Sequence, residues 1–209
     1  KWSENTDIWV PVYVDAAYEI TSLASFESKL YAGRGSDNNY LTSSDGATWS
    51  NPATNSGNNR LASFFAVVKN ARGDWSLMKT RANQISISVD PTDTVNWGAE
   101  IKAGDPDKNI TSLTSAAGTA YVGREDGLFV YNMKTNLFTD VEPDANFFSS
   151  PKNFKAAIGR GGAIWASGGE QTFWNASPTG QGDYHNWENL THLVQSNAYN
   201  GFGGHVAAL

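Results

Sequence analysis

The sequence is an internal repeat, and this feature constrains its fold more than any other. Residues 20–23 read Ile-Thr-Ser-Leu, and the same four residues recur at 110–113. Eleven positions after each start, the chain reads Tyr-Ala-Gly-Arg at 31–34 and Tyr-Val-Gly-Arg at 121–124. Two matching blocks held at one spacing indicate duplication, which must be recognised before any other structural pattern is interpreted.

The duplicated segment itself divides into two shorter units. Phe64 and Phe154 each open an apolar stretch about midway, so the unit starts fall at 20, 64, 110 and 154, with spacings of 44, 46 and 44 residues. Each position eleven residues after a start is aromatic: Tyr31, Trp75, Tyr121 and Trp165. Val206–Leu209 mimics the opening of a fifth unit. The chain therefore contains four complete repeats.

Each unit contains four short segments with strand-like composition, separated by turns rich in Gly, Asn and Asp. The predicted strands are 20–26, 29–35, 39–44 and 48–53; 64–69, 74–80, 84–89 and 96–102; 110–116, 119–124, 127–132 and 137–141; and 154–158, 163–167, 170–175 and 184–193. Alternation is clearest at 84–89, where Ile85, Ile87 and Val89 would share one face. Residues 187–194 also fit a helix, but the repeat favours a strand.

Four-stranded units of this length are typical of an all-β fold, the β-propeller of antiparallel four-stranded blades. A single blade cannot bury both of its faces, whereas radial stacking covers each face with a neighbour. The aromatic residues at the eleventh positions are therefore expected to pack between blades. The fourth segments carry aromatic residues that could do the same nearer the outside: Trp49, Trp97, Phe138 and Trp187.

The two ends of the sequence suggest further blades. Residues 8–14 resemble the outer strand of a preceding blade, and 206–209 would be the first strand of a following one. Residues 1–209 are thus predicted to be a single propeller domain, or a fragment of a ring of five to eight blades. A five-bladed ring closed within this chain would contain one defective blade. Because Lys1 is not an initiator Met, the sequence is expected to be processed or part of a longer chain.

Composition excludes several functional classes. The chain lacks cysteine, so disulfides, thiolate catalysis and cysteine-ligated metals are impossible. Its formal net charge of −6 argues against nucleic-acid binding, and no apolar run reaches the ~18–20 residues of a membrane helix. Charged residues make up only 17%, and polarity comes from 20 Asn, 20 Gly, 20 Ser and 16 Thr. Such residues suit the turns of a repeat protein.

One turn resembles a known family. Residues 43–49 read Ser-Ser-Asp-Gly-Ala-Thr-Trp, which is similar to the Asp box of BNR-repeat propellers, shortened by one residue. That family includes proteins of bacteriophage tails, virions and bacterial surfaces. The resemblance implies a structural role, away from the central cavity, for Ser43, Asp45, Gly46, Thr48 and Trp49. Asp would accept backbone N–H groups and Gly would supply positive φ.

Because sialidases also carry Asp boxes, a sialidase-like glycoside hydrolase is the alternative function. The resemblance would then imply three arginines that bind a carboxylate, and Arg34, Arg124 and Arg160 are available. Arg34 and Arg124 occupy equivalent repeat positions, however, and such positions usually report the repeat. Asp105, Asp107, Glu142 and Asp144 are interpreted as solvated turn residues, and the three histidines have no metal-ligand spacing. Neither a cofactor nor a metal is predicted.

The sequence therefore favours a non-enzymatic binding or structural module. Such a module would lie outside the cell or on a virion surface, as a phage tail or decoration protein or a cell-surface protein. Its partners would be a receptor, a glycan or neighbouring protein subunits, without nucleic acid or membrane insertion. Loops 35–39 and 177–186 are the best recognition segments, because lengthened loops carry function in repeat proteins. The candidate binding residues are Arg34, Asp37, Asn38, Arg124, Arg160, Asp183 and Tyr184.

Overall fold

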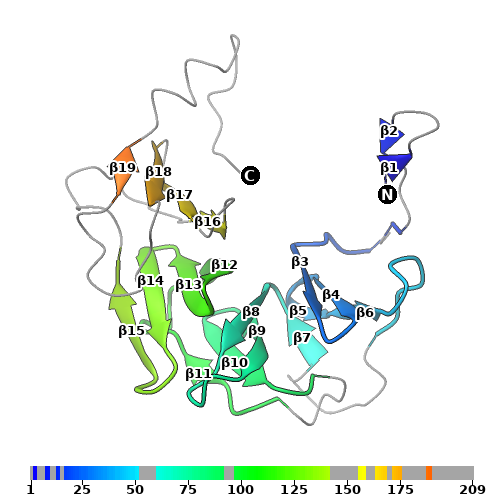
Figure 1. The fold of residues 1–209 in the computed structure, drawn as a ribbon, viewed down its shortest axis with the longest axis horizontal. Helices are drawn as coiled ribbons and strands as arrows, with labels where there is room; N and C mark the ends of the chain where they lie inside the picture. Colours follow the sequence, from blue (N-terminus) through cyan, green and yellow to red (C-terminus); the bar gives the residue numbers. More distant parts are fainter. Residues whose placement is uncertain are drawn as a thin grey trace.

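The computed structural model describes residues 2–3, 8–9, 13–14, 17–51, 60–91, 97–141, 155–158, 163–168, 171–175 and 187–189. These residues form antiparallel sheets that follow one another in chain order along an arc (Figure 1). Within them, no helix is long and apolar enough to cross a membrane. The predicted all-β architecture of antiparallel blades is confirmed.

The second and third blades match the prediction most closely. The second blade contains β8 (Phe65–Lys69), β9 (Trp75–Arg81), β10 (Gln84–Ser88) and β11 (Ile101–Lys102). The third contains β12 (Ile110–Ala116), β13 (Thr119–Arg124), β14 (Gly127–Asn132) and β15 (Leu137–Asp140). In both sheets the strands pair in sequence order, with the first strand nearest the centre of the arc and the fourth strand on its outer side (Figure 1).

The fourth blade repeats this order. It contains β16 (Lys155–Ile158), β17 (Ile164–Gly168), β18 (Gln171–Asn175) and β19 (Glu188–Asn189). Residues 187–194 were also compatible with a helix in the sequence. Of these, Glu188–Asn189 form strand β19, which pairs with β18. The remainder of that range, and the fifth start at 206–209, lie outside the described residues.

The first blade departs from the prediction. Its sheet has three strands, β3 (Ser22–Phe26), β4 (Lys29–Gly33) and β6 (Leu41–Ser43). Of the fourth strand expected at 48–53, the described residues 48–51 contribute a single bridge, between Thr42 and Ser50, and residues 52–53 lie outside the described part of the chain. Between β4 and β6 the chain instead forms β5 (Gly35–Asn39), which pairs with β7 (Leu61–Ala62).

The N-terminal residues form a separate two-stranded sheet. Strand β1 (Trp2–Ser3) pairs with β2 (Ile8–Trp9), and residues 13–14 are not in a strand. The sequence did not predict β1. The assignment of 8–14 to the outer strand of a preceding blade therefore stays a prediction, as does the number of blades in the ring.

Among the described residues, three apolar clusters lie at the interfaces between successive blades. Tyr31, Phe65 and Leu77 belong to the cluster between the first and second blades. Met78 and Val122 join the second blade to the third, and another cluster joins the third to the fourth. Because β9 and β13 are covered on both faces, nearly all their residues are buried. Burial between neighbours, rather than within one sheet, therefore holds the blades together.

The prediction is wrong for one of the four aromatic residues that were expected to pack between blades. Tyr31 and Tyr121 are fully buried, and Trp165 is partly buried, but Trp75 is 52% exposed. Tyr31 and Tyr121 are the third residues of their strands, whereas Trp75 is the first residue of β9. The turn before β9 spans residues 70–74 rather than two residues, so Leu77 takes the third position and the place in the core.

Candidate functional site

The candidate residues lie on two opposite faces. The connection face, where second strands end and the chain enters the next blade, comprises 34–40, 60–64, 81–84, 103–110 and 124–127. Backbone hydrogen bonds from Arg34 N to Ala62 O (3.0 Å) and from Ile110 N to Ala82 O (2.9 Å) tie these segments together. The turn face carries the turns after the first and third strands. Because neighbouring strands are antiparallel, these turns lie at the other end of each sheet.

On the connection face, Arg34 forms the centre of a polar group in the first blade. Its Nε donates to Asn39 O, and its Nη2 donates to Asn51 Oδ1 at 2.8 Å. Its guanidinium carbon lies 5.1 Å from the centre of the Tyr18 ring, which is 45% exposed. Asn38 Nδ2 donates to Arg34 O at 3.0 Å, so the structure brings these two predicted residues together.

The other predicted binding residues are distributed differently. The backbone of Asp37 lies in β5, beside Asn38. Arg160, Asp183 and Tyr184 lie outside the described residues. Their predicted role in binding therefore stays a prediction.

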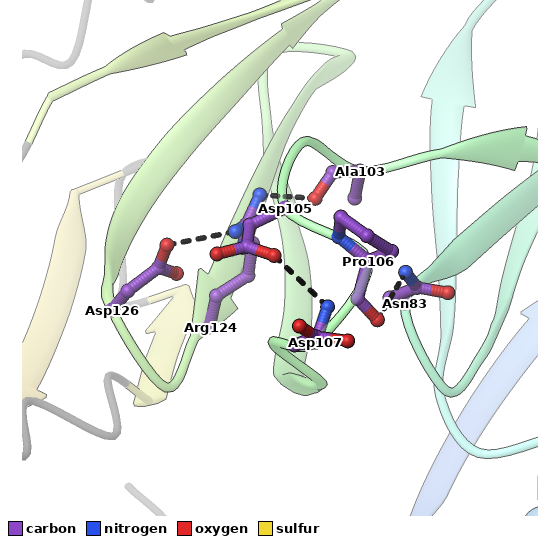
Figure 2. A network of polar contacts seen from close by, with 7 residues as sticks. All are labelled: Asn83, Ala103, Asp105, Pro106, Asp107, Arg124 and Asp126. Atoms are coloured by element: carbon purple, nitrogen blue, oxygen red, sulfur yellow. Dashed lines mark hydrogen bonds and ion pairs between the residues drawn. The ribbon is translucent and has the colours of Figure 1, made fainter.

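Arg124 lies in a second polar network, in the third blade (Figure 2). It is 2% exposed, and its Nη1 donates to Ala103 O while its Nη2 contacts Asp126 Oδ2 at 2.7 Å. Gly104 has φ +69°, and a Cβ there would lie 2.2 Å from Arg124 Nη1. The guanidinium also lies over the Phe129 ring. Arg124 thus joins its own blade to the connection that enters it.

Two polar atoms in this network are buried without a hydrogen-bond partner, Arg124 Nε and Asp126 Oδ1. One is a donor and the other an acceptor, a combination that a bridging water can satisfy. The adjoining segment is held by bonds from Asn83 Nδ2 to Pro106 O (2.8 Å) and from Asp107 N to Asp105 Oδ1 (3.0 Å). Asp105 and Asp107 are exposed, as expected of turn residues.

A third arginine on this face was missed by the sequence comparison. In the hairpin registers, Arg81 pairs with Gln84 as Arg124 pairs with Gly127, so Arg81 and Arg124 are structural equivalents. Arg81 Nη1 lies 3.8 Å from Glu100 Oε2. The repeats were aligned by their starting residues. This alignment hides the equivalence of Arg81 and Arg124, because the β8–β9 turn is longer than the β12–β13 turn. Aligning the turns after the second strands would have revealed it.

Lys79 is a second residue that sequence reasoning overlooked. It is 1% exposed in β9, donates from Nζ to Leu61 O at 3.1 Å, and lies 4.9 Å from the Trp97 ring centre. Burial lowers the pKa of Lys79 to about 7, although the nearby Glu100 carboxylate acts in the opposite direction. The only signal in the sequence was that Lys79 directly follows the apolar residues Leu77 and Met78.

The turn resembling an Asp box lies on the turn face. Asp45 Oδ1 accepts from Thr48 N at 2.7 Å and from Ala47 N at 2.8 Å. Ser43 Oγ donates to Asp45 Oδ1 at 3.0 Å and accepts from Gly46 N at 2.9 Å, where φ is +73°. The backbone N–H groups of Thr48 and Ala47 hold the pKa of Asp45 well below its ordinary value. Partly buried Trp49 lies 6.1 Å from the Tyr13 ring.

Comparison with known proteins identifies the fold. No protein-family model and no curated protein sequence matches this chain. Catalytically inactive virginiamycin B lyase from Staphylococcus aureus with quinupristin superposes with a TM-score of 0.58 and 10% identity, covering 84% of this chain and 56% of that one. An auxiliary nutrient binding protein from Bacteroides thetaiotaomicron gives a TM-score of 0.58 and 11% identity, with coverages of 82% and 41%.

YCF48 bound to D1 peptide is also similar, with a TM-score of 0.54, 13% identity and coverages of 88% and 57%. The chain therefore spans about half the length of these structures. At such low identity the likeness shows the fold alone, and that fold is the β-propeller. In the part of the chain that the structure describes, no group of three or more His, Asp or Glu residues could hold a metal ion.

Proposed function

We propose that this chain is a recognition module of a surface assembly, a non-enzymatic propeller that binds a receptor, a glycan or neighbouring subunits. Its setting would be a cell surface or a virion. The virion setting rests on the resemblance of residues 43–49 to the Asp box of phage-tail propellers. The neighbours named above include a nutrient binding protein and a peptide-bound protein. They support binding as a use of this fold, which by itself does not fix function.

The observation that carries this proposal is the expanded connection of the first blade. In the second and third blades, the second and third strands are joined by the two-residue turns 82–83 and 125–126. In the first blade, the same connection becomes β5, which is anchored on β7. An ordered expansion at one position of a repeat is where recognition is usually found.

The chemistry of this expansion also suits recognition. The Arg34 guanidinium is partly exposed and stacks near exposed Tyr18, and Asn38 is partly exposed beside it. An aromatic ring, a cation and an amide together offer stacking, charge and hydrogen bonding to a partner. Hydrogen bonds from Arg34 to Asn39 and Asn51 hold this group in position before binding, which reduces the entropic cost of association.

The test is surface binding by an Arg34→Ala/Asn38→Ala variant. Fluorescently labelled protein is applied to a glycan array, to host-range panels of bacterial cells and to detergent-released envelope proteins. The variant should keep its melting temperature and lose at least about tenfold in affinity on whichever surface binds the native chain. Lys134→Ala, which removes an exposed cation from another turn, is the matched control. Equal binding by all three proteins would contradict the proposal.

The sialidase-like alternative is tested on the same preparations. Hydrolysis of a fluorogenic sialoside by the native chain, abolished in Arg124→Ala with an unchanged melting temperature, would replace the proposed function by an enzymatic one. Because Arg124 is buried and bonded to Ala103 and Asp126, the melting temperature must be measured for this variant. Absence of turnover leaves the binding proposal in place.

A further inference from the structure

A groove opens on the turn face, between the first and second blades. It has a volume of about 510 Å³ and is lined by Glu27, Asn70, Arg72, Asp74, Trp75 and Val89. Glu27 comes from the β3–β4 turn, 70–74 form the β8–β9 turn, and Val89 follows β10. Its volume falls within the ~300–1,000 Å³ of small-ligand sites. We call it the Trp75 groove.

The apolar part of the groove is Trp75 with Val89, which are 52% and 53% exposed. Lys69 makes a cation–π contact with Trp75, since its Nζ lies 5.1 Å from the ring centre. Lys69 is fixed in turn by the third blade: its backbone N donates to Gly118 O at 2.8 Å. A Cβ on Gly118 would lie only 2.6 Å from Lys69 Cγ, so the lysine stem fills that space. The exposed ring is therefore a positioned platform.

The polar rim of the groove is equally fixed. Asn70 Oδ1 accepts from Arg72 N at 2.9 Å and from Asp74 N at 3.0 Å, which closes the β8–β9 turn. Gly73, with φ +90°, provides the reversal of the chain. The side chains of Arg72 and Asp74 consequently project from a rigid turn, and both residues are exposed, as is Glu27.

The charges around the groove favour an uncharged ligand. Glu27 and Asp74 contribute two carboxylates, and Arg72 with neighbouring Lys69 contributes two cations. Charges of both signs at this rim do not favour a phosphate or an acidic chain, which would face the two carboxylates. A purely apolar ligand would remove water from those charged groups without replacing the hydrogen bonds of that water. A ligand that combines a flat apolar surface with several hydroxyl groups would suit both the apolar platform and the polar rim.

A neutral sugar has this combination, since a pyranose ring has C–H groups on one face and hydroxyl groups around its edge. We propose that the Trp75 groove binds an uncharged glycan, whose sugar face stacks on Trp75 and whose hydroxyl groups hydrogen-bond to Glu27, Arg72 and Asp74. This inference rests on the proposed recognition function and assigns it a second site, on the face opposite Arg34.

The test uses the full chain on an array of neutral tetrasaccharides built from glucose, galactose, mannose and N-acetylglucosamine, with affinity measured by calorimetry for the best probe. Trp75→Ala should weaken binding at least about tenfold, and Trp75→Phe should restore part of it. Arg72→Ala should weaken binding severalfold. Leu137→Ala is the matched control, because Leu137 is 63% exposed on another blade and should have no effect.

Two results would overturn the inference. The first is neutral-glycan binding that survives Trp75→Ala but is lost in Arg34→Ala/Asn38→Ala, which would retain the recognition function and move the glycan to the connection face. The second is absence of binding to every neutral probe. In that case, retained binding of the chain to cells or envelope proteins would show that only the groove assignment has failed.

Discussion

At the scale of single residues, Asp45 shows how one carboxylate organises a turn. Its Oδ1 accepts two backbone N–H groups and the Ser43 hydroxyl, while Gly46 adopts a φ of +73°. These contacts are those that the residue types predict, because short acidic side chains bond to backbone groups two or three residues ahead. The sequence therefore predicted the backbone bonds of Asp45 and the positive φ of Gly46, whereas the bonds of Ser43 were not predicted.

Replacing Asp45 by Asn should lower the melting temperature at pH 7, because Asn accepts the same bonds without a charge. Since the folded pKa lies below the ordinary value of 3.8, this stabilisation is complete only above about pH 5 and is lost as the pH falls through 3.8 and below. The difference in melting temperature between the two proteins should therefore shrink between pH 4 and pH 2. Thermal unfolding followed by circular dichroism checks this, with exposed Asp107→Asn as the control.

Lys79 is a residue whose role the sequence concealed. Its ammonium is buried beside Trp97 and Tyr40 and donates to Leu61 O, so it links the second blade to β7 of the first. Burying a charge is costly unless it is well bonded, and lysine responds by losing its proton more easily. Only the tertiary structure reveals this, because the neighbours come from three distant segments.

The free energy of unfolding should depend on pH through Lys79. Its folded pKa of about 7 lies below the ordinary 10.5, so the unfolded state binds more protons between these values and stability rises with pH there. The native chain should gain up to about 1.4 kcal/mol per pH unit from pH 7 to 9 relative to Lys79→Met. Urea unfolding of both proteins measures this, and parallel pH profiles would contradict it. The range ends at pH 9 because burial raises the pKa of Tyr31 and Tyr131, which act in the opposite direction above pH 10.

At the scale of elements, the lengths of turns decide which side chains enter the core. Strand boundaries in the third blade agree with the sequence to within one residue, because its turns are short and its strands are strongly apolar. Trp75 was assigned to the core by counting from the unit start. Because the β8–β9 turn has five residues, Trp75 becomes the first residue of β9 instead of the third, and its ring is exposed. A shift of register changes the surroundings of every side chain in a strand.

The close approach of β4 to the segment entering the second blade is a prediction at this scale. A Cβ on Gly33 would lie 2.0 Å from Ser63 O, a backbone atom that cannot move aside. Gly33→Ala should therefore destabilise the protein by at least about 2 kcal/mol, as overpacking does. Gly73→Ala is the control: its φ is +90° but no atom lies within 4 Å, so only backbone strain of about 1 kcal/mol is expected. Equal losses in urea unfolding would contradict this.

At the scale of the whole molecule, stability resides in separate interfaces between blades. Leu77 lies in the cluster between the first and second blades, Ile85 in the next and Ile164 in the one after. Each blade contacts its immediate neighbours in the chain, and the sheets follow an arc (Figure 1). Such molecules behave as sums of repeats and nearest-neighbour interfaces.

Core substitutions in different interfaces should therefore be additive. Leu77→Ala is expected to cost about 2–5 kcal/mol and Ile164→Val about 0.5–1.5 kcal/mol. The double variant should equal their sum to within about 0.5 kcal/mol, because Leu77 and Ile164 lie in different clusters, with the whole third blade between their strands. Ile85→Val with Val122→Ala, within one cluster, should instead show measurable coupling. Denaturant unfolding of the single and double variants decides this, and coupling across interfaces would contradict it.

The sequence by itself determined the repeat, the all-β class, the blade order and the chemistry of the Asp45 turn. These depend on local patterns, namely apolar spacing, turn residues and hydrogen bonds between near neighbours. The tertiary structure decided the β5–β7 pair, the burial of Lys79 and Arg124, and the exposure of Trp75. Each of these depends on the register between segments far apart in the chain. That register is set by turn lengths and by packing against a neighbouring blade, neither of which a single repeat unit encodes.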